Sequence, residues 1–278
     1  MTYKASKSRF GVEIVTDGRR VDLDNIGSIW CRGIQATGFP EGIEDREKKF
    51  AETEVRRALE ALITVVMPTW INHPHRQIAA NSKPAQLYMA RQVGLDIPLT
   101  VITNDRDEVR SFWAKLDGNI IYKSLSQSLE LDPGVSLFTS LLTEKELANL
   151  DLIRLTPGIF QELVPKSHEV RATVVGSRIF SAKIESQVHE ESKLDWRHLP
   201  FEIDPQPIEL PSEVEVKVHS FMKAFGLVYG AIDFIVTPDD RYIFLEVNPG
   251  GQYIWIESIT GLGITSALAD ELSIPCHT

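Results

Sequence analysis

The chain has 278 residues, of which 43% are hydrophobic, enough to build one large domain or two smaller lobes. Acidic residues outnumber basic ones by 39 to 29, which argues against a general nucleic-acid binder. The longest apolar run, 61–68, is too short to cross a bilayer, and the start has no apolar signal region. We therefore expect a cytoplasmic protein with no nucleic-acid or membrane partner.

Helical periodicity and capping residues predict three helices, over residues 45–66, 82–94 and 105–116. Strands are predicted within 1–34, over 120–123, and over 160–164, where Pro165 ends the last one. Residues 70–76, rich in His, Pro and Asn, are predicted to form a loop, and residues 124–137 a flexible one.

Two hairpins are predicted in the C-terminal half. The first joins 170–175 to 178–186 through Gly176-Ser177, with Gly where a type II′ turn needs positive φ. The second joins 231–236 to 242–247 through Pro238-Asp-Asp-Arg241. Helices mixed with hairpin strands indicate an α/β or α+β fold with antiparallel sheet.

The second hairpin carries the most informative pattern. If Asp239-Asp240 forms a two-residue turn, Ile235 faces Phe244 and Asp233 faces Glu246. Carboxylates directly opposite each other cost about 0.2–1 kcal/mol, and more when buried, so we expect a bridging cation. Glu246 shares a strand face with Asn248, and oxygen donors of this kind suit Mg²⁺. The alternative is a hairpin with solvated acids, and a three- or five-residue loop would break the pairing.

The segments Asp233-Phe-Ile-Val and Phe244-Leu-Glu-Val-Asn-Pro-Gly-Gly251 resemble the metal-binding end of the ATP-grasp fold, in which two lobes grip ATP. The resemblance implies that Asp233, Glu246 and Asn248 hold magnesium against the ATP phosphates. Lys83 at a helix start and Lys123 at a strand end resemble the phosphate-contacting lysines of this fold. Two ammonium groups would offset part of the triphosphate charge, although a lone lysine at such a place is usually only solvated.

Residues 160–166 resemble the hinge that grips adenine in the same family. The resemblance places Gln161 in the nucleotide site and implies that the backbone of Leu163 and Val164 bonds the ring edge. It also implies that Glu162 accepts from the exocyclic amine or the ribose. The alternative is an ordinary strand with one exposed acid.

Glu169 and Arg171 lie two residues apart and so share a strand face. The resemblance places them beside the nucleotide and the reactive phosphate, and a mutual salt bridge is the alternative. The chain has neither a Walker-type phosphate loop nor a Gly-x-Gly-x-x-Gly motif, so a P-loop or Rossmann fold lacks its main support.

A narrower resemblance, to the ATP-grasp peptide maturases of the microviridin (graspetide) type, covers nearly the whole chain. The matching stretches are 28–32 (Ser-Ile-Trp-Cys-Arg), 70–74, 80–86, 97–105, 195–197 (Asp-Trp-Arg) and 248–257. Such enzymes bind a ribosomal precursor peptide through its leader and phosphorylate Asp or Glu side chains of its core. A Ser or Thr hydroxyl or a Lys amine then attacks, giving a macrolactone or macrolactam.

In that family Arg197 would contact a phosphate or the acyl acceptor, with an ion pair inside Asp195-Trp-Arg197 at a strand end as the alternative. Gln252, Trp255 and Glu257 would line the peptide side of the cleft. Residues 124–135 would close over the phosphates, although they are not strongly Gly-rich.

The resemblance implies three regions: an N-terminal α/β region over 1–76, shorter than that of relatives and expected to be incomplete, a central lobe over 77–164, and a C-terminal lobe with the metal site over 165–278. Two alternatives stay open. One is another ATP-grasp carboxylate–amine ligase, acting on an amino acid or a protein tail. The other is a non-catalytic nucleotide- or peptide-binding protein. A homodimer is retained as a candidate assembly.

Overall fold

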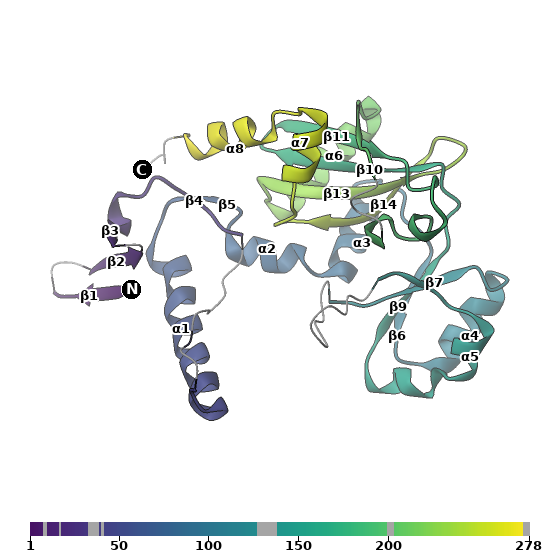
Figure 1. Ribbon diagram of the computed structural model, residues 1–278, viewed down its shortest axis with the longest axis horizontal. Coiled ribbons are helices and arrows are strands. Elements are labelled where there is room, and N and C mark those ends of the chain that lie inside the picture. The colour runs from purple at the N-terminus through teal and green to yellow at the C-terminus, as the bar shows by residue number, and fades with distance from the viewer. Residues whose placement is uncertain are drawn as a thin grey trace.

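The computed structural model describes residues 1–7, 10–16, 18–32, 39, 42–126, 138–198 and 203–274, and its strands form four sheets (Figure 1). Residues 127–135, most of the segment 124–135 that is predicted to close over the phosphates, lie outside this part of the chain. Within the described residues, no helix is long and apolar enough to cross a membrane. Helices mixed with largely antiparallel sheets confirm the predicted fold class.

The N-terminal region begins with an antiparallel sheet of β1 (Thr2–Ala5), β2 (Phe10–Thr16) and β3 (Arg19–Asp22), followed by the short 3₁₀ helix η1 (Leu23–Asn25). β4 (Ser28–Trp30) then pairs in parallel with β5 (Thr69–Ile71), and α1 (Asp45–Val65) connects them. Helix α1 confirms the predicted helix, but only Ile63 of its apolar face is buried, and Phe50 is 67% exposed.

The predicted loop over residues 70–76 is wrong, because this stretch contains the end of β5 and the start of α2 (Pro74–Ala80). Pro74 occupies the first helical turn, where its missing N–H costs nothing, and the His73 ring nitrogen accepts from the His75 N–H. The buried Asn72 between the two elements donates to the carbonyls of Tyr229 and Pro249. The polar residues are therefore caps and cross-links of an ordered segment.

The central lobe is a four-stranded antiparallel sheet in the order β6-β9-β7-β8, built from β6 (Thr100–Thr103), β9 (Gly158–Glu162), β7 (Ile120–Lys123) and β8 (Ser140–Leu141). Its core contains α4 (Arg106–Lys115) and the 3₁₀ helix η2 (Leu150–Leu155), and α5 (Glu144–Ala148) begins with a capping box. Strand β9 ends at Glu162, two residues before the predicted end, although the Leu163 N–H still donates to the Asn119 carbonyl just before β7.

The C-terminal lobe is a five-stranded antiparallel sheet in the order β12-β11-β10-β13-β14. Its strands are β10 (His168–Val175), β11 (Arg178–Ile184), β12 (Gln206–Ile208), β13 (Tyr229–Val236) and β14 (Tyr242–Asn248). One face packs on α6 (Ser212–Phe225) and α3 (Lys83–Gln92), and α7 (Ile254–Thr260) and α8 (Ile264–Leu272) form a second cluster near its far end. The short 3₁₀ helices η3 (Glu190–Ser192) and η4 (Trp196–His198) follow β11. The predicted two-residue turn is confirmed, since Val175 pairs with Arg178.

The second hairpin differs from the prediction near its turn. Val236 pairs with Tyr242, which leaves a five-residue loop, and Ile235 therefore faces Ile243 instead of Phe244. A β-bulge then shifts the register between Asp233 and Phe234. Because Leu245 is the extra residue on β14, Asp233 still lies opposite Glu246. The key pairing is confirmed although the loop length was wrong.

Candidate active site

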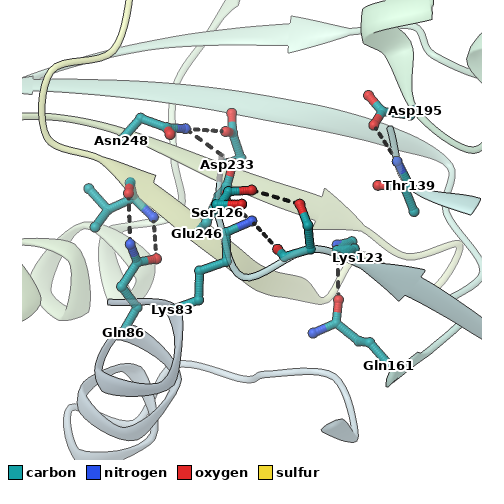
Figure 2. A network of polar contacts seen from close by, with 12 residues as sticks. Lys83, Gln86, Lys123, Ser126, Thr139, Gln161, Asp195, Asp233, Glu246 and Asn248 are labelled. Carbon is teal, nitrogen blue, oxygen red and sulfur yellow. Dashed lines mark hydrogen bonds and ion pairs between the residues drawn. The ribbon is translucent and has the colours of Figure 1, made fainter. Parts of the chain in front are cut away.

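The centre of the site is a row of charged side chains across three strands. Arg171 on β10 pairs with Asp233 on β13, which in turn pairs with Glu246 on β14. Alternation sends their neighbours Val170, Ile232 and Val247 into the core on the opposite face. Asn248, on the same face as Glu246, brings its Nδ2 to 3.1 Å from Asp233 and 3.3 Å from Glu246 (Figure 2).

Each carboxylate of this row has its own cation. Arg171 Nη1 lies 2.9 and 2.8 Å from the two oxygens of Asp233, so the alternative salt bridge between Arg171 and Glu169 is not formed. Lys83 Nζ lies 3.4 Å from Glu246 Oε2. The charged form of Asp233 is nevertheless disfavoured. Burial and the neighbouring Glu246 raise its pKa to about 6, although the charge of Arg171 acts in the opposite direction. For Glu246, burial is outweighed by Lys83, Lys123 and Arg197, which lower its pKa.

Helix α3 fixes the position of Lys83 relative to Glu246. Its Gln86, one turn further on, is buried and exchanges two hydrogen bonds of 2.9 Å with the backbone of Val247 (Figure 2). β14 is an edge strand, so Gln86 takes the place of a missing neighbouring strand between Glu246 and Asn248. Sequence reasoning missed Gln86, although its spacing of three from Lys83 puts both on one helix face.

Lys123 lies at the end of β7, where its Nζ donates to Gln161 Oε1 over 3.0 Å. Gln161 is held in turn by a hydrogen bond from its Nε2 to the Thr100 hydroxyl. Burial lowers the pKa of Lys123 to about 8, with Lys83 adding to the effect. Both ends of the Gln161 amide are thus engaged within the protein, and the residue is placed to orient Lys123.

The predicted hinge follows β9 and lines the same cavity. The Leu163 N–H already donates to the Asn119 carbonyl, so the groups that remain for a ring edge are the Leu163 carbonyl and the Val164 N–H. The Glu162 carboxylate accepts from the Leu99 N–H over 3.1 Å. One oxygen of Glu162 is therefore committed to tying the hinge to the start of β6.

Glu169 forms a buried ion pair of 2.6 Å with Lys166, whose Nζ also donates to the Leu194 carbonyl. The sequence reasoning assigned no role to Lys166, although it lies three residues from Glu169. Both line the cavity. This ion pair therefore adds no net charge to the cavity wall near Arg171.

Asp195 and Arg197 form the ion pair considered from the sequence, but Asp195 directly precedes the short 3₁₀ helix η4 and Arg197 lies on it, so the pair is not at a strand end. Asp195 also accepts from the Thr139 N–H over 3.3 Å. The hydrogen bonds and charge of Arg197 outweigh burial and hold the pKa of Asp195 well below its usual range. Arg197 keeps a side chain 46% exposed, so its guanidinium is oriented by Asp195 and still open to the cleft.

An aromatic wall adjoins Arg197. The rings of Trp196 and Trp255 have centroids 5.0 Å apart, and both side chains line the cavity with Gln252. Glu257 does not line it, because its carboxylate accepts from the Thr265 N–H at the start of α8. The expectation that Glu257 faces the peptide is therefore not met.

All these elements surround one cavity of about 820 Å³ between the two lobes. Among the described residues, no group of three or more His, Cys, Asp or Glu side chains is arranged to hold a metal. The donor set here consists of two carboxylates and one amide, which are hard oxygen ligands of the kind that Mg²⁺ prefers. These donors line the same cavity, so their chemistry fits a divalent cation.

Two antiparallel lobes with ammonium, guanidinium and carboxylate groups converging on the cleft between them define an ATP-grasp enzyme. No protein-family model and no curated protein matches the chain, but solved structures do. The macrocyclase MdnC of Microcystis aeruginosa MRC, solved with the precursor peptide MdnA, is 34% identical, with a TM-score of 0.87 over 98% of this chain and 86% of that one.

Two further structures agree. A RiPP-associated ATP-grasp ligase of Chryseobacterium gregarium, in complex with ADP and a leader and core peptide, is 28% identical with a TM-score of 0.89 over 98% of this chain and 83% of that one. The macrocyclase MdnB of Microcystis aeruginosa MRC is 27% identical with a TM-score of 0.81 over 98% and 85%. This chain therefore belongs to the RiPP-associated ATP-grasp ligases, the family that its sequence motifs resemble.

Proposed function

We propose that the chain is an ADP-forming peptide maturase, which phosphorylates Asp or Glu side chains of a ribosomal precursor peptide and closes macrolactone or macrolactam rings. The observation that carries the proposal is the row Arg171, Asp233 and Glu246, which faces Lys83 and Lys123 across one cleft. Support for the substrate comes from the similar MdnC, solved with its precursor peptide. We place the reaction in the cytoplasm, where ATP is available.

In this proposal Asp233, Glu246 and Asn248 would hold Mg²⁺, which neutralises phosphate charge and polarises the transferred phosphoryl group when bound. Lys83, Lys123 and Arg171 neutralise further phosphate charge. Arg171 and Lys83 pair with Asp233 and Glu246, so ATP and its metal would compete for these four side chains.

The hinge is proposed to bind adenine through the Leu163 carbonyl and the Val164 N–H, with Glu162 beside the ribose or the exocyclic amine. Gln161 would act on the nucleotide through Lys123, and Glu169 through the wall it forms with Lys166. Arg197, oriented by Asp195, would contact the acyl phosphate or the acceptor carboxylate. The peptide carboxylate attacks the γ-phosphorus and displaces ADP, giving an acyl phosphate. A hydroxyl or amine of the same peptide then attacks the acyl carbon, loses its proton and displaces phosphate.

Co-expression with a short acidic peptide encoded beside the gene tests the proposal by mass spectrometry. Each ring removes one water from the peptide, and ADP must form in proportion. Asp233→Asn and Glu246→Gln are expected to lower ADP release at least about a hundredfold, and EDTA to abolish it. ADP release without peptide dehydration would favour a ligase acting on another acceptor. If no peptide causes ADP release in the presence of magnesium and ATP, a binding protein would be favoured.

A further inference from the structure

The cleft extends beyond the nucleotide and metal residues into the N-terminal region. The same cavity is lined by Arg32, which follows β4, and by Arg56, Glu60 and Ile63 of α1. The Arg32 carbonyl lies 4.0 Å from the position that a Cβ on Gly250 would occupy, so this part of the cavity adjoins the loop that follows Asn248. Cys31 and Arg32, at the end of the stretch 28–32, thus line a part of the cleft that the proposed chemistry does not use.

The α1 side of this region is one face of the helix. Arg56, Glu60 and Ile63 follow the spacing i, i+4, i+7, which aligns side chains on one face. The next residue, Arg57, is 76% exposed in its side chain and does not line the cavity. The Arg57 Nη1 lies 3.0 Å from Glu60 Oε2, so Arg57 partly neutralises the Glu60 charge. Within the described residues, no ion pair joins Glu60 to Arg56.

Arg32 is held by an aromatic ring. Its guanidinium carbon lies 5.0 Å from the centre of the Trp30 ring, a cation–π distance. Neither Arg32 nor Arg56 has an acidic partner within the described part of the chain, whereas Arg171 and Arg197 in the same cavity are each paired with an aspartate. In a chain of net charge −10, two unpaired guanidinium groups facing one cavity are suited to an anionic ligand.

We propose that Arg32 and Arg56 form a second carboxylate subsite, which binds a non-reacting Asp or Glu side chain of the peptide while another carboxylate reacts near Arg197. This inference rests on the proposed function. The apolar Ile63 and Ile78 beside the two arginines would contact the aliphatic stems of such a peptide. The subsite would favour peptides with several acidic residues over those with one, since only the former can occupy both ends of the cleft.

The probe is a short fluorescein-labelled peptide of alternating Thr and Glu, with a Thr and Gln peptide as its neutral match, and binding is followed by fluorescence anisotropy without ATP. Arg32→Gln and Arg56→Gln are expected to weaken binding of the Glu peptide about three- to tenfold each. Arg91→Gln, a control at an exposed position of α3 that does not line the cavity, is expected to change it less than about twofold. The Gln peptide is expected to bind weakly and equally to all four proteins. Equal effects of the Arg56 and Arg91 changes would overturn the subsite.

Steady-state kinetics separate the two proposals. If the wild-type protein binds the Glu peptide with the expected arginine dependence but forms no ADP, the proposed function fails and the subsite stands. If ADP and dehydrated peptide form normally while Arg32→Gln and Arg56→Gln leave peptide KM and binding unchanged, the subsite fails and the function stands. The KM for ATP is expected to be unchanged in both variants. Arg32→Lys, which keeps the charge over Trp30, is expected to retain most of the binding.

Discussion

Gln86 exchanges two hydrogen bonds with the backbone of Val247, the residue that separates Glu246 from Asn248. Two proposed metal ligands therefore owe their position to a helix side chain that bonds the backbone between them. Replacing Gln86 with Leu leaves the Val247 N–H and carbonyl without partners, at a cost of about 1–3 kcal/mol for each buried group. We expect a rise of about tenfold or more in the magnesium concentration needed for half-maximal ADP release.

The control is Gln92→Leu, which makes the same change at an exposed position of α3. It is expected to leave the magnesium requirement unchanged. A Gln86→Leu enzyme with lower thermal stability but an unaltered magnesium requirement would show that Gln86 only stabilises the fold.

Lys123 predicts a pH dependence of ATP binding. Its pKa is lowered to about 8 by burial, and the protonated form is the one that attracts phosphates. The KM for ATP should therefore be lowest below pH 8 and rise as the pH increases through that value. Lys123→Arg, which stays protonated, should give a flat profile between about pH 7 and 9. A parallel rise in both enzymes would assign the titration to another group.

Gly251 predicts a steric requirement beside Arg171. A Cβ at this position would lie 2.9 Å from Arg171 Nη2, 3.0 Å from the Ala231 Cβ and 3.1 Å from the Asn248 Cβ. Gly251→Ala is thus expected to displace Arg171 from Asp233 and to lower kcat about tenfold or more, because a small misplacement of charged groups is costly. Gly263→Ala, where a Cβ meets nothing within 4 Å, should keep full activity. Equal kcat in the two variants would contradict the requirement.

Asn72 predicts a stability effect. Its side-chain amide donates to the carbonyls of Tyr229 and Pro249 and accepts from the N–H groups of Val228 and Tyr229, so one buried residue joins three segments. Asn72→Ala should lower the free energy of unfolding by about 2–4 kcal/mol in urea titrations. The exposed Asn104→Ala should cost less than about 0.5 kcal/mol. A similar loss in both variants would refute the prediction.

The sequence predicted the helices and the tight turn whose signals lie within a few neighbouring residues. Helix periodicity located α1, α3 and α4, and Gly176-Ser177 located the first tight turn. The stretch around Asn72 was misread because its polar residues signal a loop locally, and their partners lie some 150 residues away in the chain. Such long-range hydrogen bonds leave no periodicity to detect.

The site was predicted to the extent that strand alternation could place it. Glu246 and Asn248 share a face because two-residue spacing requires it, and Asp233 joins them because it lies opposite Glu246. The partners of Arg171 and Glu169 could not be foreseen, since either acid satisfies a guanidinium and the choice depends on which strand lies beside β10. The role of Gln86 required knowledge that β14 has a free edge, which is a property of the assembled sheet.

The bulge at Leu245 has a further effect on the cleft. A regular strand presents every second side chain to one surface, so an apolar and an acidic residue in succession would point opposite ways. Here Leu245 and Glu246 both line the cavity, whereas Phe244 and Val247 on either side of them lie in the core. The irregularity gives the cavity a hydrocarbon surface immediately next to a carboxylate. Deleting Leu245 would straighten the ladder, leave Asp233 opposite Glu246, and remove only the hydrocarbon half of that pair.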